Sequence, residues 1–236
     1  MYKNLFEKCI GLPINSILEN ENPQKIINNL RNAIYSISKY YTKLNPNDFN
    51  KNTIIEGDVF VGNNVNIQSN VHIKGPVILC DNVMVGTGSM LRDNVYIGEN
   101  SIIGYSNEVS NSIILNETLI SHFGAISWSI IGSNVNLGSH VATMSNLLVN
   151  EDETLEKKKI KFSGFEKYEP SSHKLGSLIG DNCKLASYVG LSPGTVLEKN
   201  SYIYPGIVLP WGKYPKDSIV YEQGYKNKIL IKEKGI

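Results

Sequence analysis

The fold of this chain is decided by residues 61–102, which in steps of six read VGNNVN, IQSNVH, IKGPVI, LCDNVM, VGTGSM, LRDNVY and IGENSI. An aliphatic residue opens every step. The series extends in both directions, and its members are Ile55, Val61, Ile67, Ile73, Leu79, Val85, Leu91, Ile97, Ile103, Val109 and Leu115. Because strands repeat every two residues and helices every 3.6, a period of six indicates a repeat of short structural units.

A unit of six residues holds one very short strand and one turn, and neither buries an apolar face alone. Three such units make a triangular coil, whose aliphatic side chains pack on those of the next coil. Turn-forming residues three positions after the aliphatics support this coil: Asp58, Asn64, Asn70, Pro76, Asn82, Gly88, Asn94 and Asn100. An antiparallel sandwich, the alternative, would alternate with period two. We therefore predict a mainly β solenoid of roughly seven coils.

Composition limits the classes of function. The chain has 236 residues, 41% hydrophobic residues and a formal charge of +1. A general nucleic-acid surface needs a basic excess, so this class is not expected. Three distant cysteines without CxxC spacing favour neither a disulfide framework nor a zinc site. No apolar run is long enough to span a membrane and no signal-peptide core opens the chain, so we expect a cytoplasmic protein without membrane insertion.

The repeat divides the chain. Residues 1–50 have helical spacing, with Asn22 as N-cap and Pro23 in the first turn, and predict a helical cap over the open end of the solenoid. Residues 51–213 form the solenoid. A polar, aperiodic stretch at about 147–176 predicts an excursion loop. The charged tail, residues 214–236, is expected to pack outside.

The period slips once within the solenoid. After Leu115 the next clear aliphatic is Ile131, and this distance of 16 is not a multiple of six. We therefore expect an irregularity in residues 121–128. The regular six-residue period resumes at Ile179.

The hexapeptides, such as VGNNV at 61–65 and IGENS at 97–101, resemble those of the left-handed parallel β-helix acyltransferases. Over residues 54–210 the sequence is most similar to the acetyltransferase domain of the bifunctional glucosamine-1-phosphate acetyltransferase/N-acetylglucosamine-1-phosphate uridylyltransferases. Archaeal sugar-phosphate nucleotidylyltransferases share the likeness. We expect the nucleotidylyltransferase domain to be absent. The resemblance implies a left-handed coil, a homotrimer and acetyl-CoA as co-substrate, with no metal.

The resemblance also implies a set of site residues. The catalytic pair is His122 and Asn146. Substrate-binding residues are Arg92, which lies sixteen before Glu108 as the family arginine does, with Glu108, Asn136 and Lys174. Residues that contact the cofactor are Ser139, Ser187 and Pro205.

These residue types suit acetyl transfer to an amine. A histidine, whose pKa is near working pH, can take the proton of the amine. An asparagine amide or a backbone N–H can stabilise the oxyanion on the thioester carbonyl. Arg92 offers bidentate contacts to a sugar phosphate, and Lys174 offers a point charge. We therefore predict an acetyl-CoA-dependent acetyltransferase for an amino sugar or sugar phosphate, with a glucosamine-1-phosphate-like acceptor, in nucleotide-sugar or cell-surface glycan biosynthesis.

Three positions depart from the family pattern. Ser110 and Ala125 stand where the family has a lysine and a tyrosine at the sugar phosphate, and His140 replaces a small residue. These departures favour an alternative, a catalytically lapsed trimeric scaffold or sugar-nucleotide binding module beside a separate nucleotidylyltransferase. A zinc enzyme of the γ-class carbonic anhydrase type is a third option. His122 and His140 have its coil-length spacing of eighteen, but its His-x₄-His pair is missing.

Overall fold

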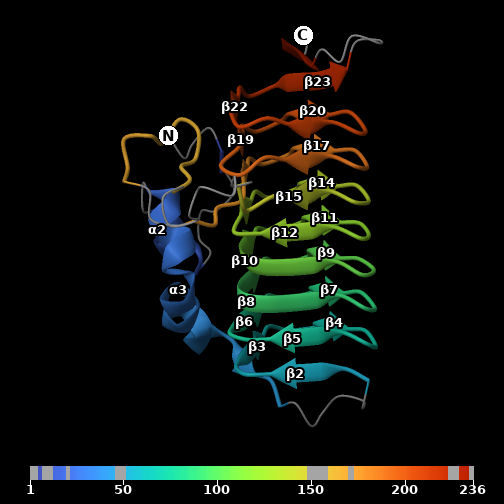
Figure 1. Cartoon of the computed structure of the whole chain (residues 1–236). Helices are drawn as coiled ribbons and strands as arrows, with labels where there is room; N and C mark the ends of the chain where they lie inside the picture. The colour runs from blue at the N-terminus through green and yellow to red at the C-terminus, as the bar shows by residue number, and fades with distance from the viewer. Residues whose placement is uncertain are drawn as a thin grey trace, which may run out of the picture.

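The computed structural model describes residues 5–6, 13–19, 22–45, 52–147, 159–169, 173–222 and 229–233. Short parallel strands stack in three columns around one axis, and together they form a prism of about eight turns (Figure 1). The predicted parallel β-helix is confirmed.

Each column of strands makes one face of the prism. The first face holds β2 (Ile54–Glu56), β5 (His72–Lys74), the start of β8 (Met90–Ile97) and of β10 (Glu108–Ile114), β12 (Ala125–Ser127), β15 (Ala142–Thr143), β18 (Gly190–Leu191) and β21 (Val208–Leu209). The second face holds β3 (Val59–Val61), β6 (Val77–Leu79), the ends of β8 and β10, β13 (Ile130–Ile131), β16 (Leu178–Ile179), β19 (Val196–Leu197) and β22 (Lys213–Tyr214). The third face holds β4 (Asn66–Ile67), β7 (Met84–Val85), β9 (Ile102–Ile103), β11 (Leu119–Ile120), β14 (Asn136–Leu137), β17 (Lys184–Leu185), β20 (Tyr202–Ile203) and β23 (Ser218–Glu222).

Asparagines line the corner between the second and third faces. Those with a left-handed backbone, at φ 54–61°, are Asn64, Asn82, Asn100, Asn134, Asn182 and Asn200. Their amides form two ladders along the axis, one from Asn64 to Asn100 and one from Asn134 to Asn200; for example, Asn82 Nδ2 donates to Asn100 Oδ1 at 3.0 Å. Because asparagine tolerates this conformation and bonds to its neighbour, the residue type that predicted the corner also stabilises it.

The position of the slip is corrected by the strand register. Ile97 pairs with Ile114, and Ile114 with Ile131, so each of these coils has 17 residues. Both coils lose their residue at the corner between the first and second faces, the earlier one between Ser110 and Ser112. The slip thus begins before Leu115, and two successive short coils explain the spacing of 16. The second short corner is at Trp128, at the end of the stretch in which the irregularity was expected.

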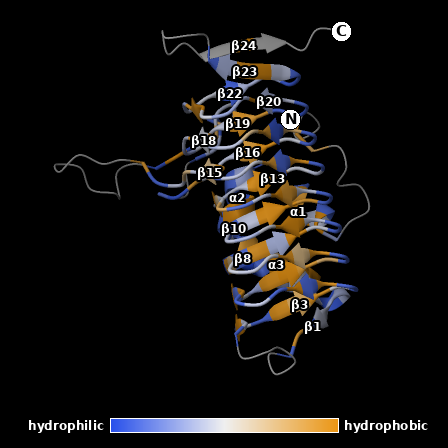
Figure 2. Ribbon diagram, turned by 90° about the vertical axis from the view of Figure 1, so that its right-hand side faces the viewer, coloured by the Kyte–Doolittle hydropathy of each residue, from blue (hydrophilic) through white to orange (hydrophobic). Residues whose placement is uncertain are grey.

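The second face is covered by the chain's own N-terminal part. The helices are α1 (Asn15–Leu18), α2 (Pro23–Asn28) and α3 (Leu30–Ile37), followed by a 3₁₀ turn (Ser38–Tyr40) and β1 (Thr42–Lys43), which pairs antiparallel with β3. Both views place α2 and α3 along the flank of the prism (Figures 1 and 2). This corrects the expected position of the cap over the open end. Outward residues of this face, such as Ile78 and Tyr96, are almost fully buried, because the apolar side of α3 packs there.

Residues 159–169 of the excursion cover the same face farther along the axis. Ile160, Phe162 and Phe165 are buried against the solenoid core. The Ser163 N–H donates to the Gly194 carbonyl at 2.9 Å. A Cβ at Gly194, whose φ is +80°, would lie 2.2 Å from the Lys161 carbonyl oxygen, so only glycine fits this contact. The rest of the predicted loop, residues 148–158 and 170–172, lies outside the described residues.

The solenoid continues past residue 213, where the tail was expected to pack outside. Strands β22 and β23 add to the second and third faces, and β24 (Ile229–Glu233) pairs antiparallel with β23. Cys80 and Cys183 are buried in the core.

Candidate functional site

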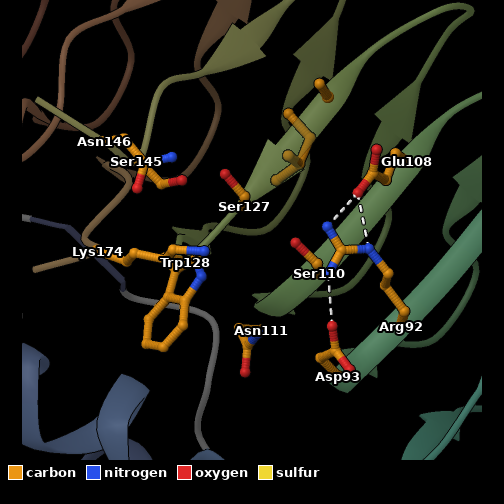
Figure 3. Close-up of a pocket in the computed structure, with 12 residues that line it drawn as sticks. Arg92, Asp93, Glu108, Ser110, Asn111, Ser127, Trp128, Ser145, Asn146 and Lys174 are labelled. Atoms are coloured by element: carbon orange, nitrogen blue, oxygen red, sulfur yellow. Dashed lines mark hydrogen bonds and ion pairs between the residues drawn. The ribbon is translucent and has the colours of Figure 1, made fainter. Parts of the chain in front are cut away.

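The corner between the first and second faces contains a cavity of about 330 Å³ (Figure 3). It lies at the corner where the two successive short coils each lose a residue and from which the excursion leaves. Four predicted site residues line it together: Arg92, Glu108, Asn146 and Lys174. Asp93, Ser110, Asn111, Ser127, Trp128 and Ser145 complete most of the wall. The structure thus brings the predicted substrate-binding residues together, except for Asn136.

Arg92 is held by two carboxylates inside this cavity. Its Nε and Nη2 donate to the same Glu108 Oε1, at 2.8 and 2.6 Å, and its Nη1 donates to Asp93. Partial burial alone would lower the pKa of Arg92, but the bonds to Asp93 and Glu108 outweigh burial and raise it. Asp93 has φ +60°, a conformation that aspartate tolerates better than most residues. The guanidinium is therefore charged and engaged from two sides.

The excursion supplies the opposite wall. It leaves after β15 and returns so close to its start that the Leu175 N–H donates to the Ser145 carbonyl at 3.1 Å. On its return the Gly176 N–H donates to the Trp128 carbonyl at 2.9 Å. A Cβ on Gly176 would come within 1.9 Å of the Ser127 carbonyl oxygen, so this approach requires glycine. The excursion therefore brings Asn146 and Lys174, far apart in sequence, into one cavity.

His122 lies at a different corner, between the third and first faces. Its side chain is exposed, and Nδ1 accepts a hydrogen bond from the Tyr105 backbone N–H at 3.3 Å. In a neutral imidazole with Nδ1 as acceptor, the proton is on Nε2. To accept a further proton, His122 must first give up this long bond.

A shallow groove of about 570 Å³ runs beside this corner on the third face. Asn136, Ser139, Ser187 and Pro205, all predicted site residues, line it. The same corner position is held in successive coils by His122, Ser139, Ser187 and Pro205. Backbone hydrogen bonds between the coils show this register. The residues predicted to contact the cofactor thus share one groove.

A row of four rings in contact on this corner was not predicted from the sequence. Tyr105 meets Phe123 edge to face, with ring centroids 5.3 Å apart, Phe123 stacks on His140 at 5.2 Å, and His140 stacks on Tyr188 at 4.5 Å. In this aromatic row (Tyr105, Phe123, His140, Tyr188), the exposed His140 is held by stacking on both sides. Phe123, His140 and Tyr188 each hold the third corner position of their coil, which was the available sequence signal, but the 48-residue spacing between His140 and Tyr188 concealed it.

His122 lies between the cavity and the groove. Its predecessor, Ser121, lines the groove, and Ala125, three residues later on the first face, lines the cavity. Asn146, by contrast, follows β15 at the far edge of the first face. Within one chain the structure therefore separates His122 from Asn146, its predicted catalytic partner.

Comparison with known proteins gives matches to one family model and to curated relatives. The family described as "GMPPB C-terminal domain" matches residues 73–163. The protein named "Bifunctional protein GlmU" from Methanococcus vannielii is 32% identical over 121 residues, 51% of this chain and 27% of the relative. Its counterpart in Methanococcus aeolicus is 33% identical over the same shares.

Over these 121 residues the chain is homologous to GlmU. The chain spans about a quarter of the length of these curated relatives.

A solved structure agrees on the fold. LpxA from Bacteroides fragilis 9343, described as a UDP-N-acetylglucosamine acyltransferase, matches with a TM-score of 0.56 and 13% identity, over 78% of this chain and 73% of LpxA. The predicted left-handed parallel β-helix is confirmed.

Two further properties concern the described residues alone. No group of three or more histidine, cysteine, aspartate or glutamate side chains there is arranged to hold a metal ion. None of the helices described is long and apolar enough to cross a membrane.

Proposed function

We propose that this chain is an acetyl-CoA-dependent acetyltransferase acting on an amino sugar or a sugar phosphate. The observation that carries the proposal is the position of His122, whose neighbours in sequence line a polar cavity on one side and a long groove on the other. The cavity would hold the acceptor sugar, and the groove would hold acetyl-CoA. The homology to the acetyltransferase region of GlmU supports this assignment.

The chemistry follows from this arrangement. The acceptor nitrogen or oxygen attacks the thioester carbonyl carbon, the C–S bond breaks, and coenzyme A leaves as the thiol. His122 would take the proton from the attacking group and deliver it to the leaving sulfur. Ser139 and Ser187 can donate hydrogen bonds to the cofactor from the groove. Asn146 lines the cavity at the far edge of the first face, so within one chain it would contact the bound acceptor and not the thioester carbonyl.

An acetyl-transfer assay tests the proposal. The chain is incubated with acetyl-CoA and a panel of amino sugars and their 1-phosphates, with detection of free thiol and of product mass. We expect thiol release that depends on the acceptor, with an acetylated sugar as product. Binding of sugar nucleotides without turnover would instead favour the scaffold or binding module, which the departures at Ser110 and Ala125 support.

We also propose that the chain forms a homotrimer. The second face is covered by the chain's own helices and excursion, whereas the first and third faces, which meet at His122, are open in the described part of the chain. A neighbouring chain can therefore pack only along these two faces. Light scattering at micromolar concentration should give three times the chain mass of 26.2 kDa. A stable monomer mass would contradict the trimer.

A further inference from the structure

The formal charges of the side chains that line the cavity sum to zero. A site that binds a phosphate is expected to carry a net positive charge. Its ionisable lining consists of two cations, Arg92 and Lys174, and two carboxylates, Asp93 and Glu108. The two positions at which the family resemblance implies further phosphate contacts carry Ser110 and Ala125. The net formal charge of the wall is therefore zero, and a phosphate dianion would meet both carboxylates as it approached Arg92.

The geometry of Arg92 also opposes phosphate binding. A guanidinium grips a phosphate through two parallel N–H groups on one edge. Glu108 already occupies the Nε–Nη2 edge, and Asp93 engages Nη1 on the other edge. A phosphate could bind bidentately only after it displaced a carboxylate that is already well placed.

The two cations do not converge on one point. Figure 3 shows Arg92 at one end of the cavity and Lys174 at the other, with Ser110 and Ser127 between them. The wall between the cations carries the hydroxyls of Ser110 and Ser127, and the carboxylates of Glu108 and Asp93 lie at the Arg92 end. Such groups suit the hydroxyl and amino substituents of a sugar ring, which both donate and accept hydrogen bonds.

Resting on the proposed acetyltransferase function, we infer that the sugar unit held in this cavity carries no phosphate. Glu108 and Asp93 accept from its hydroxyl or amino groups, Ser127 and Asn146 complete its contacts, and Arg92 orients the two carboxylates. The acceptor class is thus an unphosphorylated sugar or amino sugar.

Paired acceptors test this inference. Steady-state kcat/KM and calorimetric affinity are measured for glucosamine and galactosamine and for their 1-phosphates. Wild type should favour the unphosphorylated member of each pair by at least about tenfold. Asp93→Asn removes one negative charge from the wall and keeps a residue tolerant of positive φ, whereas Ser110→Lys adds one positive charge. Each variant should therefore shift the ratio toward the phosphate by about tenfold.

A matched control separates local charge from total charge. Ser192 follows Leu191 on the first face as Ser110 follows Val109, but it does not line the cavity. Ser192→Lys should leave the ratio unchanged. A wild-type preference for the phosphates, in turnover or binding, would overturn the inference and leave the acetyltransferase function standing. Preferential binding of the plain sugars without acetyl transfer to any acceptor would contradict the acetyltransferase function and leave the inference standing.

Discussion

Replacing His122 with alanine should lower kcat for acetyl transfer by about 10²–10⁴-fold, the usual contribution of a positioned general base. The side chain is exposed at a corner, and its one described hydrogen bond is the long one from the Tyr105 N–H. Its removal should therefore leave the melting temperature nearly unchanged. Activity is measured with saturating acetyl-CoA and the best acceptor, beside a thermal melt.

His140→Ala is the matched control for this variant. His140 occupies the next coil at the same corner, is also exposed, and stacks between Phe123 and Tyr188. Its loss should change kcat by no more than a few-fold. If both variants lost activity equally, the corner would matter for its shape, and His122 would not be the base.

The tautomer of His122 adds a second expectation. The ring must release the Tyr105 N–H before Nδ1 can take a proton, and a typical hydrogen bond contributes only about 0.5–1.5 kcal/mol net. The release therefore costs at most about one order of magnitude in rate. This cost is compatible with turnover, and it would be recovered if bound acceptor rotated the ring.

The solenoid could be predicted because its inward positions repeat along the chain. One aliphatic in six suffices to fix three faces, and the corner asparagines mark the turns. The sequence also carries a signal that the second face is covered, although the prediction of a cap over the open end did not take it into account. Segments such as Val77-Ile78-Leu79 are apolar at consecutive positions, which is typical of strands buried on both faces.

The site was predictable only in part. A resemblance can place Arg92 and Lys174 in one cavity, and the structure agrees. It cannot show that Asp93, one residue beyond Arg92, folds back in a left-handed conformation to engage the guanidinium. That contact depends on backbone geometry at an irregular corner, where the six-residue period gives no information. The separation of His122 from Asn146 likewise follows from the coil path and not from spacing.

Replacing Phe162 with alanine should destabilise the protein by about 3–5 kcal/mol, the usual cost of removing a fully buried aromatic side chain. Phe162 has no exposed surface and anchors residues 159–169 to the second face. The measurement is urea or guanidinium unfolding followed by circular dichroism. In a solenoid each coil contacts only its neighbours, so the loss should fall on the coils beneath the excursion and lower the cooperativity of unfolding.

Phe123→Ala makes the same change at a site that is 51% exposed, in the aromatic row, and should cost less than about 1.5 kcal/mol. The two variants should also differ in kinetics. The excursion that Phe162 anchors also carries Asn146 and Lys174 into the cavity, so Phe162→Ala should raise KM for the acceptor more than KM for acetyl-CoA. Equal destabilisation by the two variants would mean that Phe162 does not anchor the excursion. An unchanged acceptor KM in a destabilised Phe162→Ala protein would mean that the cavity wall is held by the contacts of Leu175 and Gly176 alone.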